Sequence, residues 1–147
     1  MKKLGLRERV VNLLARREHS RAELARKLAP HVEEGDDLDA LLDELAARKL
    51  LCDERYAEAR AHTLARKYGT ARIEHELRRQ GVAEDIVRRV AGEMRASEVT
   101  RAREAWQKRF GVLPDTPEAR ARQMRFLAAR GFDSETIRAV LRGAADD

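Results

Sequence analysis

The side chains best suited to catalysis or metal binding are scattered along this chain of 147 residues. The four histidines, His19, His31, His62 and His75, are not spaced as i and i+4 with one another or with the single cysteine, Cys52. A zinc site needs three or four converging ligands, and the sequence has no glycine-rich phosphate loop. Cys52 follows two leucines, so we expect a buried structural thiol. We predict no catalytic residue, no metal site and no cofactor, and therefore a protein that is not an enzyme.

Charge is the more informative feature. The chain carries 31 basic and 26 acidic residues, a formal net charge of +5, and 25 of the basic residues are arginine. The guanidinium group forms paired hydrogen bonds with carboxylates and phosphates, which lysine does not. The positive excess is spread along the chain without a basic tail. This composition favours docking onto an acidic protein or a nucleic acid, although a solvated arginine-rich surface would look the same.

Arginines recur at matching places in the middle and last thirds of the chain, off the apolar stripes that would face a core. Such a group could bind protein carboxylates or DNA phosphates. We predict that the partner-binding residues are Arg72, Arg79, Arg88, Arg89, Arg122, Arg125 and Arg130. Exposed arginines that only pair with carboxylates of their own helices would give the same pattern, and the sequence leaves both interpretations open.

The elements that would hold these side chains are helices. Hydrophobic residues make up 43% of the chain and charged residues 39%, so a core can form. Apolar residues recur at helical spacing, as in Leu6, Val10, Leu13 and Leu14. The alternating pattern that is typical of strands is absent. We predict an all-α protein.

The helical segments fall into three similar units of three helices, which we place at residues 1–52, 53–97 and 98–147. The segment from Leu77 to Val82 precedes the similar segment from Leu127 to Phe132 by 50 residues. Self-similarity at a fixed spacing indicates a repeat protein, whose small units stack because none buries its apolar face alone. We predict three tandem three-helix repeats that form an elongated, curved helical stack.

Several residues should begin or end these helices. Ser20, Thr70 and Thr116 each precede a helical stretch and are suited to accept a hydrogen bond from its free N–H groups. Gly81 and Gly131 each follow a helical stretch, where a positive φ is needed to turn the chain. We predict that both glycines are structural helix caps rather than functional residues.

The sequence also suggests a compartment. One cysteine cannot form an internal disulfide, which is typical of a reducing environment. We find no apolar run long enough to cross a membrane and no signal peptide, so we expect a cytoplasmic protein with no membrane partner. Since no coiled-coil pattern is present, we expect a monomer.

The first unit has the layout of a helix-turn-helix, which would suggest sequence-specific DNA binding. Its third helix would then enter the major groove with its N-terminal residues. That helix carries Asp36, Asp37, Asp39, Asp43 and Glu44, whose carboxylates would repel the phosphates. We therefore do not expect this unit to recognise an operator.

Two groups of residues resemble a known family. The segments from Asp53 to Ala57, from Tyr68 to Ile73 and from Glu76 to Val82 resemble the central motif of the RecX regulatory family. The segment from Phe126 to Asp133 resembles the closing Arg-Gly-Phe motif of that family. The two motifs stand in the family's order, in a chain of similar length.

The resemblance implies a negative regulator of the RecA recombinase. Members of this family are elongated proteins with three tandem three-helix repeats, and they bind in the groove of the RecA–DNA filament. They hinder filament extension, ATP hydrolysis and strand exchange. Direct contact with single- or double-stranded DNA is left open. The alternative is a free-standing nucleic-acid-binding protein, such as a transcription regulator, that acts without RecA.

Overall fold

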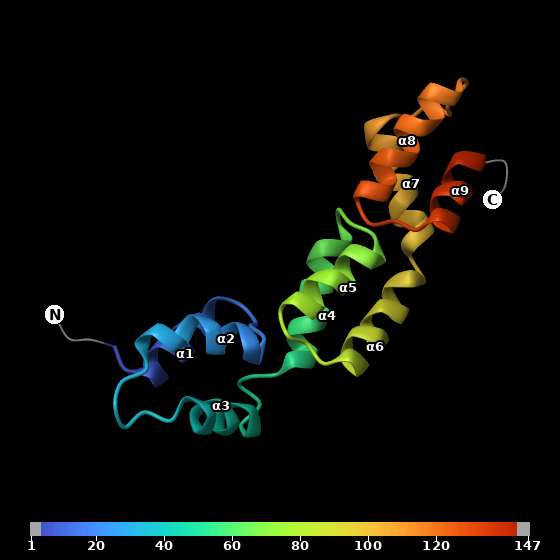
Figure 1. Ribbon diagram of the computed structural model, residues 1–147. Helices are drawn as coiled ribbons and strands as arrows, with labels where there is room; N and C mark the ends of the chain where they lie inside the picture. The colour runs from blue at the N-terminus through green and yellow to red at the C-terminus, as the bar shows by residue number, and fades with distance from the viewer. Residues whose placement is uncertain (1–3, 144–147) are drawn as a thin grey trace.

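The computed structural model describes residues 4–143, which form an elongated, curved stack of helices (Figure 1). Nine α-helices, one short 3-10 helix and no strand occur in this part of the chain, so the all-α prediction is confirmed. The order is α1 (Leu6–Arg16), α2 (Arg21–Leu28), η1 (Ala29–His31), α3 (Leu38–Ala47), α4 (Asp53–Ala65), α5 (Thr70–Arg79), α6 (Glu84–Arg95), α7 (Glu98–Arg109), α8 (Pro117–Ala129) and α9 (Ser134–Arg142).

The helices form three tandem three-helix repeats, as predicted: α1–α3, α4–α6 and α7–α9 follow one another along the stack in Figure 1. Each repeat has a separate apolar core. Aliphatic side chains fill the first core, among them Leu24, Leu28 and Leu42. The second is built around Tyr56 and Ile73. Because each core is small, the polar contacts between repeats help to hold the stack together.

Two of the predicted N-caps are confirmed. The Ser20 hydroxyl accepts a hydrogen bond from the N–H of Glu23 at 3.0 Å, and the Thr116 hydroxyl accepts one from Ala119 at 3.1 Å. Pro117 follows as the first residue of α8, where its missing N–H costs nothing. The local sequence is therefore sufficient to set the start of α2 and α8.

The predicted cap at Thr70 is wrong. Thr70 is the first residue of α5, and its buried hydroxyl has no hydrogen-bond partner. Its N–H instead donates to the Glu98 carboxylate at 2.7 Å, from the first residue of α7. The start of α5 is therefore capped by a carboxylate from the next repeat and not by the Thr70 hydroxyl. Cys52, expected to be buried, is only partly buried where it precedes α4.

Candidate partner-binding surface

The two junctions between repeats are built in the same way. At the first, the Asp53 carboxylate accepts the N–H of Arg21 at 2.8 Å. At the second, Glu98 accepts the N–H of Thr70 at 2.7 Å. In both cases the first residue of one repeat caps the second helix of the preceding repeat, where the helix dipole favours a negative charge. This shared contact fixes how neighbouring repeats stack.

Gly81 and Gly131 lie at these junctions. They follow α5 and α8 with φ values of +78° and +93°. Val82 donates its N–H back to the Leu77 carbonyl at 3.1 Å, and Phe132 donates to Leu127 at 3.2 Å. This is the hydrogen-bond pattern of a helix that ends on a left-handed residue.

The neighbouring repeat leaves no room for a side chain at either glycine. A Cβ at Gly81 would lie 2.5 Å from the Cβ of Ala22 in α2. A Cβ at Gly131 would lie 2.6 Å from the Cβ of Arg72 and 2.9 Å from its backbone nitrogen. Each glycine therefore has two roles, because it ends a helix and also lets the start of the preceding repeat's second helix approach closely.

Two of the seven predicted arginines belong to the second junction. Arg72 donates to the Ala129 carbonyl at 3.0 Å, and its guanidinium lies 4.6 Å from the centre of the Tyr68 ring. Arg130 donates to the Lys67 carbonyl at 3.2 Å, and its own carbonyl accepts the N–H of Gly69 at 2.8 Å. Both side chains therefore hold the second and third repeats together.

Two more of the seven are engaged in ion pairs. Arg89, on α6, pairs with Glu58 at 3.0 Å, with Glu93 at 3.3 Å and with Glu54 at 3.9 Å. The hydrogen bond with Glu58 raises the pKa of the Arg89 guanidinium. Arg88 lies on the same helix, with a side chain 78% exposed and a single contact at 3.7 Å to Glu84. Exposed pairs of this kind add little to stability.

The remaining three, Arg79, Arg122 and Arg125, are exposed, and their side chains make no ion pair or hydrogen bond within residues 4–143. Arg122 and Arg125 are three residues apart on α8, so they share a face of that helix. Arg79 is the last residue of α5, in the second repeat. These three side chains keep their hydrogen-bonding groups free for a partner.

A half-buried arginine that sequence reasoning missed supports the second junction. Arg101 donates to the carbonyls of Tyr68 at 2.5 Å, Met94 at 3.1 Å and Ala65 at 3.4 Å. Burial lowers the pKa of its guanidinium. Asp53, Glu98 and Arg101 were missed because their partners lie in another repeat. The one available signal was the acidic residue at the start of both the second and the third unit.

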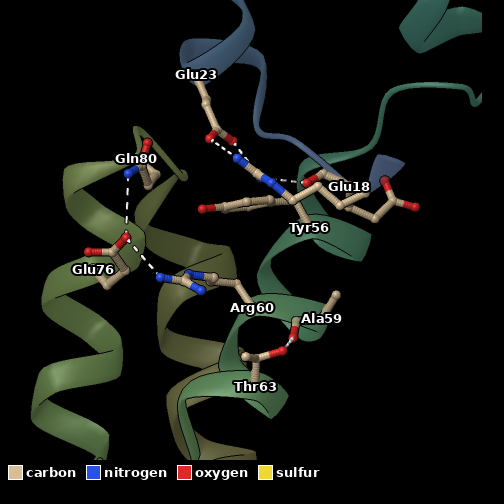
Figure 2. A pocket seen from close by; sticks show the side chains of 9 residues that line it. Glu18, Glu23, Tyr56, Ala59, Arg60, Thr63, Glu76 and Gln80 are labelled. Carbon is tan, nitrogen blue, oxygen red and sulfur yellow. Dashed lines mark hydrogen bonds and ion pairs between the residues drawn. The ribbon is translucent and has the colours of Figure 1, made fainter. Parts of the chain in front are cut away.

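A pocket of about 420 Å³ lies at the first junction, between α2, α4 and α5 (Figure 2). Arg17 donates to Glu23 at 2.6 and 3.1 Å. Burial alone would raise the pKa of Glu23, but the hydrogen bond and charge of Arg17 lower it below its usual value. Figure 2 shows Glu76 between Gln80 and Arg60, at 3.4 and 3.6 Å. The charges in this pocket are thus compensated from within.

Other kinds of site find no support in the part of the chain that the structure describes. No group of three or more histidine, cysteine or acidic side chains is arranged to hold a metal ion there. No described helix combines the length and apolar character that a membrane span requires.

Three stacked helical repeats with separate cores, joined by polar contacts and covered with arginine, define a repeat scaffold that presents a long surface. The sequence matches the family models for the second and third three-helix domains of RecX, over residues 53–90 and 96–141. The regulatory protein RecX of Ralstonia nicotianae is 44% identical over 141 residues, which cover 96% of this chain and 89% of that protein. The RecX of Leptothrix cholodnii is 46% identical over 139 residues, 95% and 88% of the two chains. This chain belongs to the RecX family.

Solved structures show the same fold. The crystal structure of RecX from Lactobacillus salivarius superimposes with a TM-score of 0.78, at 18% identity, over 93% of this chain and 92% of that one. A second structure, of a regulatory protein RecX, gives 0.75 at 19% identity and covers 97% of this chain and 72% of that one. At such low identity the three-repeat architecture persists while most side chains differ.

Proposed function

We propose that this protein is a negative regulator of the RecA recombinase, and that it binds as a monomer in the groove of the RecA–DNA filament. Its membership of a regulatory family supports this proposal. The observation that carries it is the shape: a curved stack of three repeats suits a ligand that itself repeats along a groove. Such a regulator would act in the cytoplasm and would limit filament extension, ATP hydrolysis and strand exchange. It would be a binding protein rather than an enzyme.

Within this proposal, Arg79, Arg122 and Arg125 are the first candidates to contact the filament, since they are exposed and unpaired within the described residues. Arg88 joins them, because its single contact with Glu84 is long and exposed. Arg89 would have to give up its ion pairs with glutamate side chains before it could bind the partner. Guanidinium groups suit both RecA carboxylates and DNA phosphates because each is planar and offers paired donors.

The alternative, a free-standing nucleic-acid-binding protein, would use a single recognition helix. In the first repeat, α3 would have that role, but its N-cap is Asp37 and its first turn carries Asp39. Both side chains are exposed, and carboxylates at this end of a recognition helix would face the phosphates. This distribution of charge favours the filament regulator.

The proposal predicts the effect on RecA activity. Adding the protein in amounts well below one molecule per RecA subunit should suppress DNA-dependent ATP hydrolysis by RecA. The reason is that one molecule bound at a growing filament end stops the addition of many subunits. Hydrolysis is measured during assembly on circular single-stranded DNA. Unchanged hydrolysis and strand exchange in the presence of a large excess of the protein would refute the proposed function.

A further inference from the structure

The second junction has a pocket at the same place as the pocket of Figure 2, and its charge is very different. This second-junction pocket, of about 330 Å³, lies between the end of α4, α7 and α8. Six basic side chains line it, and Glu104 is its only acidic one. The basic residues are Arg66, Lys67, Arg101, Lys108, Arg109 and Arg130.

The two pockets are built from matching positions in successive repeats. In each, the walls come from the chain before the second helix, from the first helix of the following repeat, and from the end of that repeat's second helix. The structure therefore offers the same cavity twice, with different side chains. At matching positions the first pocket has Tyr56, Thr63, Glu76 and Gln80, and the second has Arg101, Lys108, Phe126 and Arg130.

The basic charge of the second-junction pocket is compensated only in part, by the charges of Glu98 and Glu104 near Arg101. None of its six basic side chains forms an ion pair with a carboxylate among residues 4–143. Arg101 and Arg130 donate to backbone carbonyls, and Arg109 lies 5.2 Å from the centre of the Phe110 ring. Like charges around one cavity repel each other, so a bound anion would stabilise the arrangement. The first pocket gains no such benefit, because Glu23 and Glu76 already pair there.

We infer that the second-junction pocket binds a phosphate group of a nucleic-acid backbone, with Arg101 and Arg130 as fixed charges and Lys67 and Lys108 as mobile ligands. The two lysines are exposed and have no hydrogen bond or ion pair from their side chains within the described residues. A pocket of this size lies in the range of about 300–1,000 Å³ that small ligands occupy. The inference rests on the proposed function, since the DNA of the filament would supply the phosphate.

A row of phosphates fits this surface better than a single protein carboxylate. Arg122 and Phe126 on α8 and its C-cap residue Arg130 follow one another at intervals of four residues, so they lie on one face of that helix. Arg122 is therefore next to the pocket, outside it, with its guanidinium unpaired. Six basic side chains in the pocket and one beside it exceed what one planar carboxylate can engage, whereas successive phosphates of one strand can occupy both places.

The test is direct binding of a fluorescein-labelled oligothymidylate, without RecA, measured by fluorescence anisotropy over a range of salt concentrations. In Lys67→Glu with Lys108→Glu, we expect the affinity at low salt to fall at least tenfold. The slope of log affinity against log salt should also fall by roughly 1.4, since each phosphate contact on a single strand contributes about 0.7. Inorganic pyrophosphate should compete with the oligothymidylate for the wild-type protein, and should not compete with it for this variant.

The matched control is Arg16→Glu with Arg48→Glu, which changes the charge equally in the first repeat. Arg16 is the last residue of α1 and Arg48 the C-cap of α3, and both side chains are exposed and form no hydrogen bond or ion pair within the described residues. Lys67 and Lys108 lie similarly near the ends of α4 and α7. We expect less than a threefold loss of affinity from the control. Circular dichroism and thermal melting show whether both variants are folded like the wild type. If the charge-reversed test pair melts at a lower temperature than the wild type, Lys67→Gln with Lys108→Gln is used in its place.

Three outcomes would overturn the inference. The control could lose as much affinity as the test pair, which would indicate a general charge effect. The wild-type protein could fail to bind the oligothymidylate at any salt concentration. The test pair could keep its DNA binding and lose only its binding to RecA filaments, which would identify a protein carboxylate as the occupant. The proposed function is tested separately. If the wild-type protein suppressed RecA without binding free oligothymidylate, the inference would be wrong and the proposed function would stand.

Discussion

Replacing Gly131 with valine should lower the thermal melting temperature by roughly 5–15 °C. A side chain at this positive φ costs about 1–2 kcal/mol. The added Cβ would also lie 2.9 Å from the backbone nitrogen of Arg72, and such overpacking typically costs about 1–3 kcal/mol. For a chain of this size each kcal/mol shifts the melting temperature by about 2–4 °C. Gly81→Val should have a smaller effect, because the close contact there involves the Ala22 side chain alone.

The control for this prediction is Gly92→Val, at an exposed position in the last turn of α6. A Cβ at Gly92 meets no atom within 4 Å, and the backbone there has no positive φ. Valine is a better helix former than glycine by a few tenths of a kcal/mol. The melting temperature of this variant should equal or slightly exceed that of the wild type. Equal melting temperatures for Gly131→Val and Gly92→Val would contradict the role of Gly131 in the second junction.

Reversing the charges of Arg122 and Arg125 together should weaken binding to RecA filaments at least tenfold, or about 1.4 kcal/mol. Both side chains are exposed on α8 and hold no other residue among 4–143, so the fold should be unaffected. Binding of Arg122→Glu with Arg125→Glu is compared with binding of the wild type by surface plasmon resonance on immobilised filaments, after circular dichroism has shown the same helix content.

The choice of residues for this test follows from the structure. Arg72 is unsuitable because it holds the second junction through the Ala129 carbonyl. Arg17 is unsuitable as a control because its ion pair with Glu23 belongs to the first junction. Arg16→Glu with Arg48→Glu is the better control, and it should lose less than threefold in affinity. A loss as large as that of the test pair would mean that the predicted arginines are not a specific surface.

The sequence was sufficient for the fold because the fold depends on local signals. Apolar spacing and caps such as Ser20 and Thr116 mark the helices, and the resemblance of Leu127–Phe132 to Leu77–Val82 marks the repeat. Each of these signals lies within one helix or one turn. Nothing in them depends on how the repeats are placed relative to one another.

The junctions could not be predicted in the same way. Apolar periodicity separates a core from an exterior, but the junctions are made of polar side chains and glycine. Arg72 and Arg130 therefore looked like free surface residues, although each bonds a carbonyl of the neighbouring repeat. Thr70 looked like a cap, but α5 begins at Thr70 itself with Gly69 as its cap, and the distant carboxylate of Glu98 accepts the N–H of Thr70. The difference between the two pockets also becomes visible only once the ends of three helices have been brought together.

We propose that, at physiological salt, this protein binds the RecA–DNA filament much more tightly than it binds RecA or DNA alone. Co-sedimentation tests it directly, with filaments assembled on single-stranded DNA and with free RecA and free DNA as separate controls, at physiological salt. The protein should pellet with the filaments and remain in the supernatant with free RecA, and it should pellet far less with DNA alone because salt weakens phosphate contacts. Equal pelleting with DNA in the absence of RecA, or none with filaments, would contradict the claim.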